Sequence, residues 1–433
     1  MHTQILKIGI VLHFTGEPLS LPELRAHIAE RARCIPALSA AIGGAIGSGN
    51  GNGNGNDRGR GPRWARLPLD LAAHVRGLEL PGGGAVEDAV SGLADAEFPR
   101  GGPPWDMTLL YGYAPGRYAL VYRVSHGVLD MGGVAHAVEA LFGPGALPPE
   151  RSSAVARGLE GSPGGTARHA VVAARLLAGA TAKSGVWPHP DHPFSAKRAY
   201  AWADVPRDAL RDGARPYGGT CNDAYIAALA RVTGAWLAEY APHAYGRGVP
   251  MNVAVNLRSP GEADILGNHV VSGRLMLPGQ EASPEQVFAA TLRGTAPLKS
   301  PARRAAVRRL VRGSQRLVRS LPPRLMDLSA RAFLSPERAA VLCSNFVLRN
   351  PLRWRDDPVH AVDGVTALPP GVPLSVLLIT YQERASAVFV SDPALPGMDK
   401  AHQHWQRIVH EQAATARSPL PPTLPPPTPR IRR

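Results

Sequence analysis

The sequence predicts an α/β protein made of two halves, each a mixed sheet flanked by helices. Three observations indicate this. Strand-like and helix-like segments follow each other irregularly, 433 residues are more than one core of ordinary size requires, and a Pro/Gly-rich stretch from Gly143 to Gly165 separates two such mixtures. Because the segments do not alternate regularly, two α+β sandwiches fit better than one repeating parallel unit.

The first half is expected to span residues 1–160. Its opening helix carries a capping box, with Ser20 at the N-cap, Glu23 three residues later and Pro22 in the first turn. A Gly/Asn-rich stretch at residues 43–62 reads as a flexible insertion, because its glycine spacing matches no phosphate-binding loop. The other expected elements are strands at Ile5–Phe14, Thr108–Tyr113 and Arg117–Ser125, and a helix at Val134–Phe142.

A linker at residues 161–189, with a bridging helix over about 166–184, is expected to lead into a second half at residues 190–417. The Pro-rich basic tail at 418–433 is predicted to be extended and disordered. The second half is predicted to contain helices at Asp223–Tyr240 and Asp399–Ala416 and a basic helix between Arg303 and Arg324, with strands at Met251–Leu257, Val270–Leu277, Ala340–Leu348, Pro373–Tyr381 and Ala387–Ser391.

Composition limits the classes of function. Three distant cysteines suggest neither a disulfide framework nor a metal site, and no signal peptide or membrane-spanning run is recognised, so a cytoplasmic protein without bound metal is expected. The formal net charge is +14, and eight arginines without an acidic residue lie between Arg303 and Arg324. This helix reads first as a solvated basic face, with peripheral membrane or polyanion contact as the alternative.

The clearest chemical signal is His126 at the end of a predicted strand, followed four residues later by Asp130 and then by a helix. An imidazole at a strand end faces a crevice rather than a sealed core, and its pKa suits proton transfer near neutrality. By itself, a His-x-x-x-Asp spacing is more often a structural histidine beside a helix-capping aspartate. The sequence that flanks His126 favours the catalytic role over the structural one.

The run PPWDMTLLYGYAPGRYALVYRVSHGVLDMGGVAHAVEALF resembles the active-site segment of the bacterial wax ester synthase/diacylglycerol acyltransferase family, within the superfamily of condensation domains and CoA-dependent acyltransferases. Pro104-Trp105 is similar to that family's Pro-Leu-Trp element, and His126 and Asp130 fall on the second histidine and the aspartate of its His-His-x-x-x-Asp-Gly motif. Cys221-Asn222-Asp223-Ala224, MNVAVNLRSP and Leu266-Gly267-Asn268 resemble further elements in the same order.

The resemblance implies two chloramphenicol-acetyltransferase-like halves with an active-site tunnel between them. It also implies an O-acyltransferase in which His126 is the general base, without a covalent intermediate and without a tightly bound cofactor. The donor would be acyl-CoA or an acyl-carrier protein, and the acceptor a small molecule with a hydroxyl or amine. Asp130 is assigned to the catalytic motif, held by an ion pair with Arg258 and supported by Gly132. Substrate contacts are expected from Ser125, Trp105, Asn222, Asp223 and Asn345, of which Trp105 also fits a core position and the Asn222-Asp223 pair also fits a helix cap.

The chain departs from the family pattern at several points. Ser125 stands for the first histidine, Met131 for the glycine, and the stretch beginning at Asn345 lacks the Asn-Val-Pro-Gly-Pro run. These changes leave the acceptor and acyl length open. Three alternatives remain: a condensation-type transferase that uses an acidic carrier protein in natural-product biosynthesis, a binding module without catalysis, and, ranked last, nucleic-acid binding through the basic helix, so no nucleic-acid partner is expected.

Overall fold

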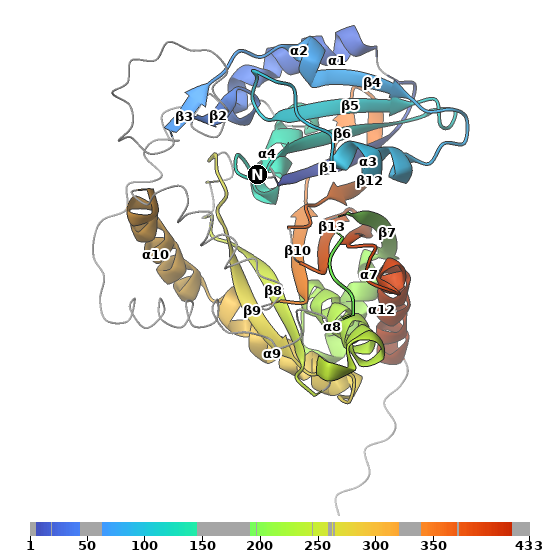
Figure 1. The fold of residues 1–433 in the computed structure, drawn as a ribbon. Helices are drawn as coiled ribbons and strands as arrows, with labels where there is room; N and C mark the ends of the chain where they lie inside the picture. The colour runs from blue at the N-terminus through green and yellow to red at the C-terminus, as the bar shows by residue number, and fades with distance from the viewer. Residues whose placement is uncertain are drawn as a thin grey trace, which may run out of the picture.

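A computed structural model describes residues 6–18, 20–43, 63–144, 191–195, 197–244, 246–258, 262, 265–319, 339–369 and 372–417. Within them the chain forms two six-stranded sheets and one small two-stranded sheet. Figure 1 shows the two large sheets as separate lobes, one above the other.

The first sheet has the strand order β11-β12-β1-β6-β5-β4. Its strand β1 runs antiparallel to both neighbours, β6 and β12, whereas β4 and β5 are parallel. Because β1 and β6 lie in the middle of the sheet and both of its faces are covered, their side chains are buried on both faces. The bounds are β1 Lys7–Thr15, β4 Val75–Glu79, β5 Trp105–Tyr111, β6 Arg117–Ser125, β11 Arg353–Trp354 and β12 Asp357–Val365.

The second sheet has the order β7-β14-β13-β10-β8-β9. Strand β10 pairs with β13 along its whole length but with β8 only from Val341 to Cys343, so β8 and β9 diverge from β10 beyond that point. The bounds are β7 Ala199–Pro206, β8 Val249–Asn256, β9 Val270–Leu277, β10 Val341–Leu348, β13 Leu374–Tyr381 and β14 Arg384–Ser391. The small sheet pairs β2 Ala40–Gly43 with β3 Arg63–Arg66.

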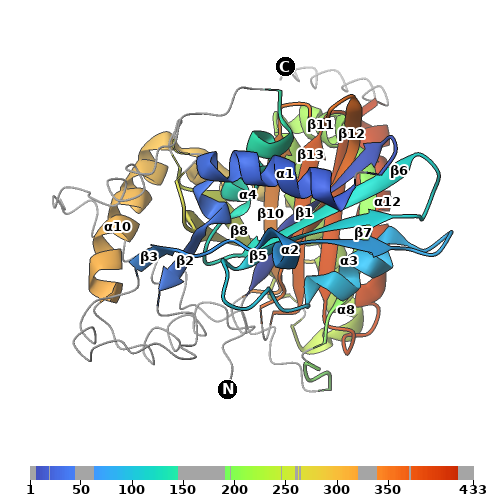
Figure 2. The same cartoon turned by 90° about the horizontal axis from the view of Figure 1, so that it is seen from above.

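Helices cover the outer faces of both sheets, and Figure 2 shows α1 lying across the first sheet. Capping boxes at Ser20 and Ser283 begin α1 and α9, and satisfy backbone N–H groups that would otherwise lack partners. The bounds are α1 Leu21–Arg31, α2 Leu71–His74, α3 Val86–Ala94, α4 Met131–Phe142, α7 Arg207–Ala214, α8 Cys221–Tyr240, α9 Pro284–Lys299, α10 Pro301–Arg319 and α12 Ala401–Arg417. Short 3-10 turns occupy Ala32–Cys34, Pro36–Leu38, Arg215–Tyr217, Pro242–Ala244 and Met398–Lys400.

Three apolar clusters hold these layers together. One lies between the second sheet and the helices α7, α8 and α12, and a second fills the space between the first sheet, α1 and α4. A third packs α3 against the opposite face of β1 and β6 and reaches Tyr200 and Trp202 on β7, so it joins the two lobes. The edge of the second lobe is therefore fixed against the first lobe close to where β1 begins.

The second half inferred from the sequence contributes two strands to the first sheet. Although β11 and β12 come late in the chain, they complete the first sheet, and Figure 1 shows β12 at the junction of the lobes. Strand β12 was not predicted from the sequence, because its apolar pattern is interrupted by Pro358, His360, Asp363 and Gly364. The boundary at residues 160–190 therefore does not separate the strands of the two sheets, because β11 and β12 follow it in the chain and still belong to the first sheet.

Most expected elements appear with small shifts at their ends, and β6 and β9 have the predicted bounds. The bridging helix at 166–184, the tail at 418–433 and all but residue 43 of the Gly/Asn segment lie outside the described residues. Within the described helices, none combines the length and the apolar character that crossing a bilayer requires.

Candidate active site

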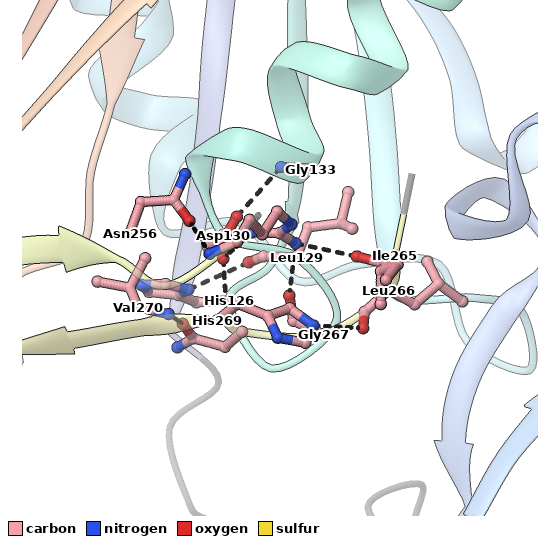
Figure 3. A network of polar contacts seen from close by, with 12 residues as sticks. His126, Leu129, Asp130, Gly133, Asn256, Ile265, Leu266, Gly267, His269 and Val270 are labelled. Atoms are coloured by element: carbon pink, nitrogen blue, oxygen red, sulfur yellow. Dashed lines mark hydrogen bonds and ion pairs between the residues drawn. The ribbon is translucent and has the colours of Figure 1, made fainter. Parts of the chain in front are cut away.

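His126 lies in the turn that follows β6, close to the loop that joins β8 and β9 in the other lobe (Figure 3). Its backbone N–H donates to the carbonyl of Leu6 at 2.8 Å, and the N–H groups of Val128 and Leu129 both donate to Ser125. These bonds close a tight turn against the start of β1. The histidine remains half-buried, so its ring is not sealed inside the core.

The imidazole of His126 has one ring nitrogen fixed by the turn. Nδ1 lies 3.1 Å from the carbonyl oxygen of Leu129. A carbonyl oxygen only accepts hydrogen bonds, so the Nδ1 that faces it carries the proton of the neutral ring. The lone pair is then on Nε2, and this tautomer can accept a proton from a substrate.

Asp130 lies at the N-cap of α4 and is 1% exposed in its side chain. Oδ1 accepts the backbone N–H of Gly133 at 3.1 Å, and Oδ2 accepts from the backbone of His269 at 2.8 Å and from the guanidinium of Arg258. Among the described contacts none joins the carboxylate to the His126 ring. These contacts fit a positioning role, in which Asp130 holds the loop as the pair with Arg258 suggested from the sequence, and its place among the catalytic residues stays a prediction.

Arg258, at the end of β8, forms the ion pair with Asp130 that the sequence suggested. It also donates to the carbonyls of Ile265 and Gly267 at 2.9 and 3.1 Å, which ties the β8–β9 loop to the same carboxylate. The N–H of Gly267 in turn donates to the carbonyl of Val128 at 2.9 Å. The histidine turn is thus held from the other lobe (Figure 3).

Gly132 lies beside this ion pair. A Cβ atom at this position would lie 3.2 Å from Oδ1 of Asp130 and 3.3 Å from Nη1 of Arg258. Its expected supporting role therefore has a steric basis, because a larger side chain would crowd the pair.

Ser125 and Trp105 are held by local contacts. Oγ of Ser125 accepts the N–H of Gly127 at 3.3 Å, and Ser125 pairs with Lys7 across the strands. Trp105 is fully buried, and its indole N–H donates to the carbonyl of Leu38 at 2.9 Å. Trp105 is a core residue, so its assignment as a substrate contact does not fit the structure.

Asn222 and Asp223 begin α8, where Asp223 forms a capping box with Thr220. Asp223 is 0% exposed; it pairs with Lys299 and accepts from Thr295 Oγ1 at 2.7 Å. Burial would raise the pKa of this carboxyl, but the hydrogen bonds from Lys299, Thr295 and Thr220 keep it below its usual value. None of these contacts connects it with the His126 turn among the described residues, so the capping role accounts for its burial.

Asn345 is exposed on β10, in the part of the strand that β8 no longer pairs. Its side chain therefore lies next to the place where the second sheet opens. Contact with a substrate from Asn345 stays a prediction, and so does contact from Asn222 or Ser125.

Sequence reasoning missed His269. Its backbone N–H binds Asp130 and its ring Nε2 lies 3.0 Å from the carbonyl of Leu266, so it helps to shape the β8–β9 loop. Its place directly after the Gly267-Asn268 element was the available signal. Among the described residues, no group of three or more histidine, cysteine or acidic side chains could hold a metal ion.

The chain thus has two lobes, the first of which is completed by two strands from the later part of the chain, and a histidine turn that is held from the opposite lobe. Solved structures share this fold. A wax ester synthase/diacylglycerol acyltransferase from Marinobacter aquaeolei VT8 is 15% identical, covers 96% of each chain and has a TM-score of 0.60. The first condensation domain of the CDA synthetase is 17% identical, covers 95% of this chain and 90% of that one, and has a TM-score of 0.61. The predicted fold class is confirmed.

Sequence comparison points to the same family. Residues 58–156, which include His126 and Asp130, match the family model of the wax ester synthase/diacylglycerol acyltransferase catalytic domain. The resemblance stated from the motifs is therefore confirmed. A Mycobacterium tuberculosis H37Rv protein named for an inferred diacylglycerol O-acyltransferase activity is 24% identical over 242 residues, 52% of this chain and 49% of that protein. The chain spans about half the length of the curated relatives it matches.

Proposed function

We propose that the protein transfers an acyl group from an acyl-CoA thioester to a hydroxyl or amine, with His126 as the general base. The observation that carries this proposal is the orientation of one ring. Nδ1 of His126 faces the carbonyl of Leu129, so Nε2 is the basic nitrogen, and the ring is half-buried in a turn held from both lobes.

The proposed reaction needs only this base and two bound substrates. Nε2 removes the proton of the acceptor O–H or N–H as the oxygen or nitrogen attacks the thioester carbonyl. The carbon–sulfur bond then breaks, and the imidazolium returns the proton to the departing thiolate, which yields the ester or amide and free CoA. General-base assistance contributes ~10²–10⁴ in rate, so alignment of the two substrates supplies much of the remaining acceleration.

A carrier-protein-bound donor is the second candidate. The fold likeness to condensation domains favours it. A solved starter condensation domain of rhizomide synthetase was captured in complex with C8-CoA and Leu-SNAC. That domain is 13% identical, covers 96% of this chain and 91% of its own, and has a TM-score of 0.60. Contact of α10 with an acidic carrier or with a membrane surface stays a prediction. Equal concentrations of acyl-CoA and acyl-carrier protein, offered in separate assays, identify the donor by which one is consumed.

The test of the base is His126→Ala, with thiol release from acyl-CoA followed across a panel of alcohols and amines. We expect kcat to fall on the order of 10²- to 10⁴-fold, while the free energy of unfolding changes little. His404→Ala, at an exposed position of α12, is the matched control and should keep wild-type turnover. Equal thiol release by wild type and His126→Ala would contradict the assignment of the base, and no thiol release by either would leave a binding module as the better reading.

A further inference from the structure

A pocket opens at the seam of the two lobes, at the start of β1. Its walls come from both lobes: Leu6, Lys7, Ala94 and Asp95 from the first, and Arg198, Tyr200 and Ala367 from the later part of the chain. Leu6 is also the residue whose carbonyl holds the backbone N–H of His126. The same stretch of backbone therefore supports the proposed base and lines the pocket.

The pocket carries an excess of positive charge. Lys7 donates from Nζ to the backbone carbonyl of Asp95 at 2.8 Å, and the carboxylate of Asp95 pairs with Arg198. The ionised lining groups are two cations and one carboxylate, which leaves one positive charge without a counter-charge in the lining. Burial and, next, the charge of Arg123 lower the pKa of Lys7, so a bound anion would relieve an unfavourable position for the ammonium.

The segment that carries Asp95 is held in place by a buried arginine, Arg123. Arg123 on β6 is 0% exposed, forms an ion pair with Asp106, and donates to the carbonyls of Leu93 and Ala96. These contacts hold the end of α3 and the loop with Asp95, while the charge of Arg123 is already matched by Asp106. The groups around Lys7 are thus pre-arranged before any ligand arrives, which reduces the cost of binding.

Tyr200 on β7 is a neutral donor among the lining residues. Burial raises the pKa of its phenol, so the hydroxyl keeps its proton at neutral pH. Tyr200 stacks with Trp202, and both pack into the cluster between α3 and the first sheet. The ammonium of Lys7 and the phenol of Tyr200 are both hydrogen-bond donors, and donors of this kind favour an oxygen anion over a cation.

We propose that this seam pocket binds an oxyanion carried by one of the two substrates. A carboxylate on the acceptor is the expected group, because its single negative charge equals the excess charge of the lining. The assignment rests on the proposed acyl transfer, and it defines an acceptor class, hydroxy or amino acids, that the histidine motif does not define.

The first arm of the test compares acceptors that differ in one charge. A series of ω-hydroxy acids and their methyl esters is assayed with one acyl-CoA, and the ratio of kcat/KM for acid over ester is measured. We expect a ratio above one in wild type and a loss of about tenfold in Lys7→Met, because a charge-assisted hydrogen bond contributes about 1.5–3 kcal/mol and 1.4 kcal/mol is a factor of ten. Lys7→Arg should keep much of the ratio. Lys400→Met, at an exposed position, should leave it unchanged.

The second arm tests the donor as the source of the oxyanion. Acyl-CoA is compared with the N-acetylcysteamine thioester of the same acyl group, which has no phosphates. A Lys7→Met defect seen only with acyl-CoA assigns the oxyanion site to a donor phosphate. If Lys7→Met changes neither ratio, the proposal is overturned.

Failure of the proposed function is a separate outcome. If wild type consumes no thioester with any acceptor, the acyl transfer is wrong, but the pocket remains testable by titration calorimetry of an ω-hydroxy acid into wild type and Lys7→Met. Binding to wild type that is about tenfold weaker in Lys7→Met would still support the oxyanion site. Equal binding, or none, would overturn it.

Discussion

Two networks of ion pairs, each centred on a buried aspartate, join the lobes. In the site network, Asp130 after β6 pairs with Arg258 after β8. In the remote network, Asp363 on β12 accepts from His13 at 2.7 Å, Ser386 at 2.5 Å and Arg384 at 2.9 Å. In both networks a buried aspartate of the first lobe binds an arginine that follows or belongs to a strand of the second sheet.

The networks differ in what else holds the backbone. Asp363 lies inside a regular strand, opposite Val11 of β1, so sheet pairing fixes its backbone without the ion pair. Asp130 lies in a turn, and its carboxylate supplies the bonds that orient Gly133, His269 and the β8–β9 loop. The ion pair of Asp130 should therefore control the geometry of the His126 turn, whereas the ion pair of Asp363 should contribute only to the free energy of unfolding.

The largest expected effect comes from Arg258→Met. Removing one partner of a buried pair leaves Asp130 charged without compensation, which costs about 3–5 kcal/mol. Because the β8–β9 loop also loses its anchor, kcat should fall on the order of 10²-fold through displacement of the His126 turn. Urea unfolding and steady-state kinetics measure the two effects separately.

The matching control removes both charges. Asp130→Asn with Arg258→Met keeps a good N-cap residue and leaves no buried charge, so the unfolding free energy should recover in part. The activity should not recover with it, since the loop anchor is still absent. Full recovery of kcat in the double variant would show that the pair has no part in positioning the histidine.

A smaller effect is expected from Arg384→Met. Asp363 keeps its bonds from His13 and Ser386, so the unfolding free energy should drop by about 1–3 kcal/mol. The kcat should stay near the wild-type value, because this network does not touch the His126 turn. A kcat loss as large as that of Arg258→Met would show that the two networks do not differ in their effect on the His126 turn.

The sequence predicted the Asp130–Arg258 network, because its members lie in motifs that are recognisable from local pattern. The His126 turn was accessible because β6 alternates, ends and is followed by a helix within a few residues, and the Arg258 partner followed from a strand-plus-arginine element. The remote network was not predicted, because β12 joins the first sheet from nearly 350 positions away in the chain, as the His13–Asp363 pair shows. Likewise the sequence left two readings each for Trp105 and Asp223, a substrate contact or a core and a cap position, and their packing fits core and cap.

The seam pocket could not be predicted from the sequence either. Lys7 and Asp95 are far apart in the chain, and Arg198 lies in the other half, so no spacing in the sequence relates them. Their proximity depends on α3 packing against β7, which is a property of how the lobes meet.

The smallest effect is a pH dependence of the remote network. Burial would raise the pKa of Asp363, but the hydrogen bond and charge of His13 and the charge of Arg384 keep it well below its usual value. A depressed carboxyl pKa stabilises the folded state above the pKa of the unfolded chain, about 3.9, and this contribution disappears as the pH falls through the folded value. The stability difference between wild type and Asp363→Asn should therefore be constant at and above about pH 5 and shrink below about pH 4. Urea unfolding at a series of pH values measures this difference, and one that stays constant down to the lowest pH would mean that the aspartate gains nothing from its charged partners.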